Sequence, residues 1–236
     1  MTPPVVELTG VSKDYRSLRP LRVEQLIVRG GEHVALMGLD RPMAEVFVNL
    51  VTGAALPDSG TVKVFGRPTS AVTDSTDWLG VVDRFGIVSE RAVLLDALTV
   101  LQNLTLPFTL EIEPPPHEAG QRAANLAQEV GLPESTWAKP LAALGATARA
   151  RVQLARALAL DPSVLLLEHV TADVGRQEVR SFAGCIRSAA ARRGAAIVAL
   201  TADEPFAAAV AQRVLVLEAA TGRLKKRRRW LARRSW

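Results

Sequence analysis

Residues 34–45 read VALMGLDRPMAE, and this stretch decides the fold that the sequence predicts. The apolar segment Val34–Met37 indicates a strand, and the apolar run Val46–Val51 indicates the start of a helix. A phosphate-binding loop, G-x-x-x-x-G-K-[ST], stands between a strand and a helix, and the eight residues from Gly38 have that position. These eight residues are Gly38, Leu39, Asp40, Arg41, Pro42, Met43, Ala44 and Glu45.

The residue types that hold phosphate are missing from this octet. In the loop pattern the second Gly lets backbone N–H groups close on phosphate, the Lys reaches the outer phosphates, and the hydroxyl binds Mg²⁺. Those three positions hold Met43, Ala44 and Glu45, so only Gly38 agrees with the pattern. A carboxylate at Glu45 would repel a triphosphate. We therefore expect a vestigial nucleotide loop that binds ATP weakly or not at all and has lost its Mg²⁺ site.

Seven segments, in order and at suitable spacing, resemble the ATPase subunit of ABC transporters across residues 5–224. They are Gly31–Gly38, Asn49–Gly53, Pro57–Gly66, Phe85–Leu104, Leu144–Leu158, Asp161–His169 and Ala196–Asp203. The resemblance implies an α/β, P-loop NTPase-like fold. It would have a mainly parallel core sheet, an N-terminal antiparallel β-subdomain and a helical insert at about residues 95–160.

The resemblance also identifies the positions where the family carries its catalytic side chains. Glu90 stands where the family has the Gln of its Q-loop, and Glu168 stands where it has the Asp linked to Mg²⁺. His169 replaces the general-base Glu, and Ala202 replaces the switch His. His169 could act as a base or could be a plain residue at the end of a strand. Tyr15 fits the aromatic that stacks on adenine, or it simply packs.

The family's signature, L-S-G-G-Q at a helix N-terminus, contacts the nucleotide of the opposite subunit. The corresponding residues here are Leu144 followed by Gly145, Ala146 and Thr147, so this is a vestigial signature. Side chains at Ala146 and Thr147 would crowd the approach of the backbone to phosphate. Thr147 could still offer a hydroxyl to that nucleotide, or it could cap the helix.

The strand pattern agrees with this fold. Alternating segments at Val5–Leu8 and Leu21–Val28, with the strand Thr61–Phe65, suit the antiparallel subdomain. Two further segments, Val164–Leu167 and Ile197–Leu200, are as uniformly apolar as Val34–Met37. Such strands are buried on both faces, as in a parallel sheet flanked by helices.

The segment Glu113–Pro116 indicates a break in the chain, and helical patterns follow it. Gln121–Val130 has an amphipathic pattern that ends at Gly131 and Pro133. Residues 141–160 are rich in Ala, Leu and Arg, which is a strong signal for helix.

Length and composition exclude several classes of protein. A chain of 236 residues with 48% hydrophobic and 22% charged residues is globular and can bury a large core. No apolar stretch approaches the roughly 20 residues that span a bilayer, and the N-terminus lacks a secretory pattern. The lone Cys185 cannot form an internal disulfide. We expect a cytoplasmic protein, peripheral at the inner face of the cell membrane.

The positive charge is concentrated at the end of the chain. Eight of the 29 Lys and Arg lie between Arg223 and Trp236 with no acid among them. The remaining 21 bases face 24 acids, so the body carries a net charge of −3. We therefore divide the chain into a degenerate ATPase-type domain, residues 1–224, and a basic tail, residues 225–236. The tail could be merely solvated, could contact an anionic membrane, or, less favoured, could contact nucleic acid.

Three functional hypotheses remain open. The first is a catalytically degenerate subunit of an ABC transporter that pairs with an active ATPase subunit and a membrane permease and hydrolyses little or no ATP. The second is a weak ATPase that uses His169. The third is a regulatory or scaffold protein that reuses the fold. The substitutions affect every catalytic motif while the apolar strands stay intact, which favours the first.

Overall fold

The centre of the fold is a six-stranded sheet in which alternate residues face two different hydrophobic cores. In spatial order its strands are β10 (Arg223–Lys226), β9 (Arg213–Glu218), β3 (His33–Met37), β8 (Ala196–Leu200), β7 (Val164–Glu168) and β6 (Phe85–Val88). Every neighbouring pair is parallel except β9 and β10. The computed structural model describes residues 2–227. It confirms the mainly parallel core sheet.

The three central strands are buried along their whole length, because both faces of the sheet are covered. In β3, Val34 and Leu36 join a cluster that includes helix α1 (Arg41–Val51). Ala35 and Met37 join the opposite cluster, which includes the helices of the other face. The uniformly apolar strands in the sequence are thus explained by burial on two sides.

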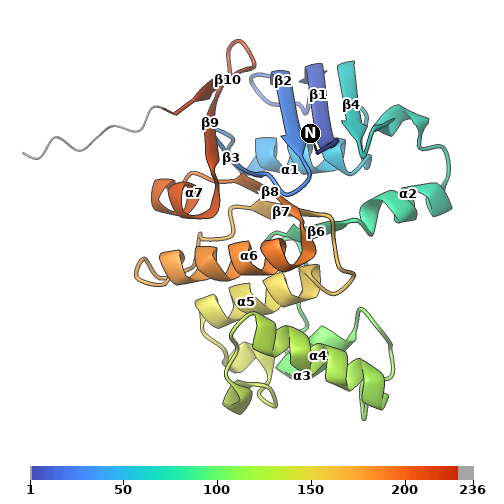
Figure 1. Ribbon diagram of the computed structural model, residues 1–236, viewed down its shortest axis with the longest axis vertical. Helices are drawn as coiled ribbons and strands as arrows, with labels where there is room; N and C mark the ends of the chain where they lie inside the picture. The colour runs from blue at the N-terminus through green and yellow to red at the C-terminus, as the bar shows by residue number, and fades with distance from the viewer. Residues whose placement is uncertain (1, 228–236) are drawn as a thin grey trace, which may run out of the picture.

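A second, antiparallel sheet covers one side of this core together with α1 (Figure 1). It confirms the antiparallel subdomain, and its long strands contain the segments predicted at the start of the chain except for Phe65, which follows β4. In spatial order its strands are β2 (Leu21–Arg29), β1 (Pro4–Lys13), β4 (Ser59–Val64) and β5 (Arg67–Pro68). A short turn η1 (Thr69–Ala71) and helix α2 (Ser75–Val82) lead from it to β6.

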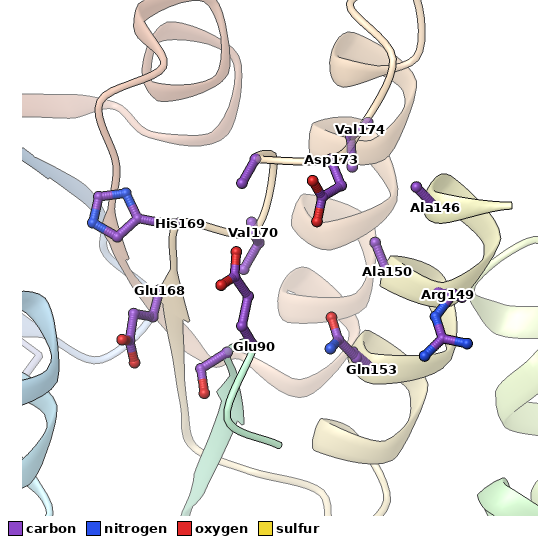
Figure 2. A pocket seen from close by; sticks show the side chains of 12 residues that line it. Glu90, Ala146, Arg149, Ala150, Gln153, Glu168, His169, Val170, Asp173 and Val174 are labelled. Carbon is purple, nitrogen blue, oxygen red and sulfur yellow. The ribbon is translucent and has the colours of Figure 1, made fainter. Parts of the chain in front are cut away.

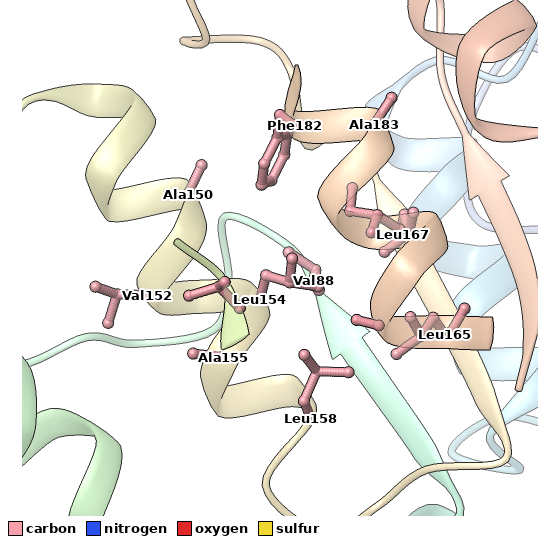
Figure 3. Packing of buried hydrophobic residues seen from close by; sticks show 14 of the residues in the cluster. Val88, Ala150, Val152, Leu154, Ala155, Leu158, Leu165, Leu167, Phe182 and Ala183 are labelled. Carbon is pink, nitrogen blue, oxygen red and sulfur yellow. The ribbon is translucent and has the colours of Figure 1, made fainter. Parts of the chain in front are cut away.

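The other face carries the remaining helices, with the predicted helical insert at the opposite end of the molecule from the antiparallel sheet (Figure 1). The insert contains α3 (Val100–Thr105), α4 (His117–Glu129), η2 (Glu134–Thr136), η3 (Leu141–Ala143) and α5 (Ala146–Ala157). Helices α6 (Val179–Arg193) and α7 (Glu204–Val210) follow. Figure 3 shows part of the buried cluster on this face, which includes Leu154 of α5, Leu158 directly after α5, Phe182 of α6 and Leu165 of β7.

Three predicted boundaries differ from the structure. Helix α1 begins at Arg41, five residues before the predicted start, because Asp40 caps it. The helical stretch predicted over residues 141–160 is interrupted and ends early: η3 ends at Ala143, the backbone is extended at Leu144 and Gly145, and α5 ends at Ala157. Strand β10 contains the first two residues of the predicted tail, and residues 228–236 of the tail lie outside the described part of the chain.

Candidate nucleotide-binding site

The start of α1 is closed by a carboxylate of the chain itself. Asp40 has extended backbone, and its Oδ1 accepts the N–H of Met43 at 2.9 Å. The carbonyl of Asp40 accepts the N–H of Ala44 at 2.9 Å. Pro42, in the first turn, has no N–H to leave unpaired. The free amides that make a helix start attractive to phosphate are therefore partly used by Asp40.

Only three residues, Gly38 to Asp40, connect β3 to α1. Gly38 has a φ of +86°, and a Cβ there would lie 2.8 Å from the carbonyl oxygen of Leu217 in β9. A residue with a side chain would be strained and would clash with backbone. The close approach of Gly38 to β9 therefore explains the Gly at this position without any role in binding phosphate.

The early helix start decides which side chains of the octet reach the surface. Ala44 is fully buried and Leu39 is nearly so, both in the cluster beneath α1. Met43 packs partly against the same cluster. Glu45 keeps its side chain 47% exposed and faces the segment that follows β6. Position 44, where the loop pattern has Lys, therefore faces the core.

Arg91 joins the two carboxylates at the predicted Mg²⁺-binding positions. Its Nη1 lies 3.0 Å from Oε1 of Glu45, and its Nη2 lies 2.7 Å from Oε2 of Glu168. Glu168, the last residue of β7, has a side chain only 10% exposed. The sequence reasoning missed Arg91, because a single Arg in a loop carries no motif and its partners lie 46 and 77 residues away.

A second ion pair lies beside the first. Arg41 at the start of α1 pairs with Glu90 at 2.7 Å, and both side chains are largely exposed. Each pair uses one of two consecutive residues, Glu90 and Arg91, on the segment after β6. Four carboxylates and two guanidinium groups thus lie at this end of the sheet. The carboxylates belong to Asp40, Glu45, Glu90 and Glu168, and the guanidinium groups belong to Arg41 and Arg91.

His169 directly follows β7 in a left-handed conformation, with φ of +48°. Its N–H donates to the carbonyl of Leu200 at 2.9 Å, which continues the pairing of β7 with β8. Its Nε2 is buried without a hydrogen-bond partner in the described part of the chain. Ala202, after β8, is exposed and offers no side-chain polar atom.

Tyr15 lies in the loop between β1 and β2, and its ring packs against the cluster that contains α1. Its hydroxyl is buried and has no hydrogen-bond partner among residues 2–227. It lines neither of the two clefts that the other candidate residues form.

The signature residues form the start of α5. Gly145 is its N-cap residue, and Ala146 and Thr147 are in its first turn. The expectation that Thr147 caps this helix is wrong, because its hydroxyl donates instead to Oε2 of Glu178 at 2.5 Å. Glu178 directly precedes α6. A carboxylate therefore lies beside the vestigial signature.

Two adjoining clefts bring these positions together. One, of about 190 Å³, is lined by the start of α1, the segment after β6 and the end of β7, including Arg41, Pro42, Glu45, Glu90 and Arg91. The other, of about 360 Å³, lies between the end of β7 and α5. Figure 2 shows its walls, with Glu90 and Glu168 on one side and Ala146, Arg149 and Gln153 on the other.

No group of three or more His, Cys, Asp or Glu side chains among residues 2–227 is arranged to hold a metal ion. No helix in the same range is long and apolar enough to cross a bilayer.

Comparison with known families and proteins agrees with this architecture. Residues 25–172 match the family model described as ABC transporter. The chain is 29% identical over 215 residues to the methionine import ATP-binding protein MetN of Brucella abortus (strain 2308), a match that covers 91% of this chain and 58% of MetN. MetN of Leifsonia xyli subsp. xyli is 30% identical over 217 residues, covering 91% of this chain and 63% of that protein. The chain thus spans less than two thirds of these relatives.

Two solved structures share the fold. The ATP-binding cassette MJ0796, solved as a dimer in a post-hydrolysis state bound to ADP and Pi, aligns with a TM-score of 0.76 at 23% identity, covering 94% of this chain and 99% of that one. CbiO1 from Clostridium perfringens, part of the ABC transporter complex cbiONQ, aligns with a TM-score of 0.79 at 20% identity, covering 94% and 87%. The fold is that of the ABC ATPase cassette.

Proposed function

Because the chain belongs to the ABC transporter family, we propose that it is a nucleotide-binding-type subunit of a transporter that binds Mg-ATP weakly or not at all. In this proposal it pairs with a different, active ATPase chain and with a membrane permease at the inner face of the cell membrane. The names of its relatives and structural neighbours describe import ATPases and transporter components. They motivate a role in transport.

The observation that carries the proposal is the charge at the vestigial loop. A triphosphate would enter a site with four carboxylates and two guanidinium groups that are already paired with them. It would also compete with Asp40 for the N–H of Met43. Losing a charge-assisted contact such as the loop Lys costs roughly 1.5–3 kcal/mol. Adenine stacking on Tyr15 could return only about 1–3 kcal/mol.

The catalytic positions support the same proposal. General-base catalysis contributes about 10²–10⁴ to a rate, and it needs a base within hydrogen-bond reach of the attacking water. The Nε2 of His169 is buried, and Ala202 has no polar side-chain atom. Glu168 is engaged with Arg91. We therefore favour a subunit without turnover of its own over a weak ATPase that uses His169.

The residues at the signature position suggest that ATP hydrolysis by the partner chain is also slowed. In a head-to-tail dimer each nucleotide lies between the phosphate loop of one chain and the signature of the other. The partner's ATP would therefore face the start of α5, where Ala146 and Thr147 add side chains and Glu178 adds a carboxylate. We propose that the active partner hydrolyses ATP more slowly in this pair than opposite an L-S-G-G-Q signature.

The basic tail could add a membrane contact to this assembly, since basic charge near an anionic surface is worth about 1 kcal/mol per residue. The proposal here rests on the charge of the sequence alone. Flotation with anionic liposomes would compare the full chain with one ending at Arg227, a cut that leaves β10 intact. Equal flotation of both forms would show that residues 228–236 do not contribute to membrane binding.

Purification from the host membrane tests the function directly. A tagged full-length chain, extracted in mild detergent, should bring with it a permease and a second ATPase chain that carries an intact G-x-x-x-x-G-K-[ST] loop. The purified complex should hydrolyse ATP, and a Lys-to-Ala change in the partner's loop should abolish that activity. Recovery of this chain as a homodimer that hydrolyses ATP by itself would contradict the proposal.

A further inference from the structure

We propose that the guanidinium of Arg91 stands in for the lost divalent cation, and that it fixes the segment after β6 to the core without any nucleotide. The inference rests on the proposed function, because it assumes that no Mg-ATP competes for the same carboxylates. It adds a role for a residue that no family motif identifies. We call residues 89–98, which connect β6 to the helical insert, the linking segment.

The geometry at Arg91 is that of a bridge between two elements. Two different nitrogens of one guanidinium contact two carboxylates, at 3.0 Å for Glu45 on α1 and at 2.7 Å for Glu168 on β7. These carboxylates stand where the family's loop hydroxyl and its Mg²⁺-linked Asp stand. Arg suits such a bridge because its planar group is always charged and presents five donors in a fixed fork.

Of the two contacts that Arg91 makes, the one with Glu168 matters more for stability, because Glu168 is more buried than Glu45. The side chain of Glu168 is 10% exposed, whereas those of Glu45 and Arg91 are 47% and 41% exposed. An exposed pair contributes little to stability. A buried carboxylate that loses its partner is strongly unfavourable, because neither water nor another charge replaces that partner. The position of Arg91 is therefore held mainly by Glu168.

Further contacts extend this bridge along the linking segment. Glu90 pairs with Arg41 at 2.7 Å. On the other side, Arg156 of α5 donates to the carbonyl of Val93 at 2.6 Å, and Arg149 of α5 pairs with Asp96 at 2.7 Å. The linking segment is thus tied to α1 and β7 at its start and to α5 beyond. These charged contacts add to the buried apolar cluster that the core and the helical insert share, and to the backbone hydrogen bonds that Leu141 and Ala142 donate to the linking segment.

Removing the guanidinium tests whether it replaces a cation. In Arg91→Ala, the carboxylates of Glu45 and Glu168 would face each other without a positive charge, and a divalent ion could bind between them. We expect exchange of the amide hydrogens of Ala92 and Leu95 to become roughly tenfold faster or more, with a lower Tm. Millimolar Mn²⁺ or methylguanidinium should restore most of both, whereas the wild type should respond to neither.

Two controls separate this bridge from a general loss of charge. Arg67→Ala breaks an ion pair between β5 and α2, that of Arg67 with Asp77, and should leave exchange in the linking segment unchanged. Arg91→Ala combined with Glu168→Gln should lose the response to Mn²⁺. If Arg91→Ala does not fold, Arg91→Gln keeps a polar side chain without the charge and should show the same faster exchange.

The outcomes distinguish this inference from the proposed function. Unchanged exchange in Arg91→Ala, or no recovery with either cation, would overturn the bridge even if the wild type binds no ATP. Micromolar binding of Mg-ATP by the wild type would overturn the proposed function and, with it, the premise of this inference.

Discussion

Ala44 stands where the phosphate-loop pattern has Lys, yet its side chain is fully buried beneath α1. The cause is Asp40, which starts the helix at Arg41 and thereby turns position 44 toward the core. A single substitution therefore cannot rebuild the site: the missing Lys has no path to the surface, and Asp40 already uses the amide of Met43.

We predict that Ala44→Lys destabilises the protein and does not create ATP binding. The ammonium group would be buried without a carboxylate beside it, which costs about 3–5 kcal/mol in the free energy of unfolding. Urea unfolding at pH 7 would measure this change. Pro42→Lys places the same side chain on an exposed position of the same turn and should cost less than about 1 kcal/mol. Equal stability of the two variants would show that position 44 can turn outward.

The turn from β3 into α1 sets the shape of the whole loop, because Gly38 approaches the backbone of β9 closely. We predict that Gly38→Ala lowers the free energy of unfolding by about 2 kcal/mol or more, through backbone strain and the clash with Leu217. Gly66→Ala is the matched control. Gly66 has a similar φ of +81°, but a Cβ there meets nothing within 4 Å. It should cost only about 1 kcal/mol. If the two variants lose the same stability, the contact with β9 is unimportant.

His33, at the start of β3, makes the stability of the protein depend on pH. Burial, aided by the charge of Arg187, holds the pKa of His33 below its usual value of 6.5. The folded chain therefore takes up this proton less readily than the unfolded chain. Its contribution to stability is complete above pH 6.5 and is lost as the pH falls through the lowered pKa. His33→Leu should lose less stability than the wild type between pH 7.5 and pH 5 in urea unfolding. An identical loss in both would contradict this role.

The strands were predictable from sequence to a greater degree than the helices and the site. Strands such as Val164–Glu168 are buried on both faces, so their composition alone identifies them. The start of α1 was missed because the motif pattern assigned Asp40 to a loop, whereas its carboxylate caps a helix. Helix propensity could not detect the break at Gly145, which separates η3 from α5.

The sequence showed which residue types occupy the candidate site, but it could not predict the contacts that these residues make. The resemblance identified Glu45 and Glu168 as residues of the wrong type for Mg²⁺. It gave no reason to connect them through Arg91, because that contact depends on how the linking segment lies against α1 and β7. Likewise, the partner of Thr147 is Glu178, which belongs to a different element and no motif.

The molecule as a whole has the fold of the ABC ATPase cassette, and the proposed loss of nucleotide chemistry concerns both the loop and the signature. At the signature face, Gly145 has open space around its Cβ position, so a side chain can be added there. In a reconstituted complex with an active partner, Gly145→Ser with Ala146→Gly and Thr147→Gly should raise ATP turnover by roughly tenfold or more. Gly184→Ser, at a half-buried position of α6 where a Cβ also meets nothing within 4 Å, is the control. An unchanged rate in the triple variant would sink the proposed pairing at this face.

Calorimetric titration of the purified full-length chain with Mg-ATP tests the central claim most directly. Base stacking alone supplies about 1–3 kcal/mol, and a dissociation constant of about 1 mM already needs 4.1 kcal/mol. We predict no saturation at any concentration below the millimolar range. Saturable binding with a micromolar dissociation constant would mean that the carboxylates around α1 admit a triphosphate, and it would contradict the account.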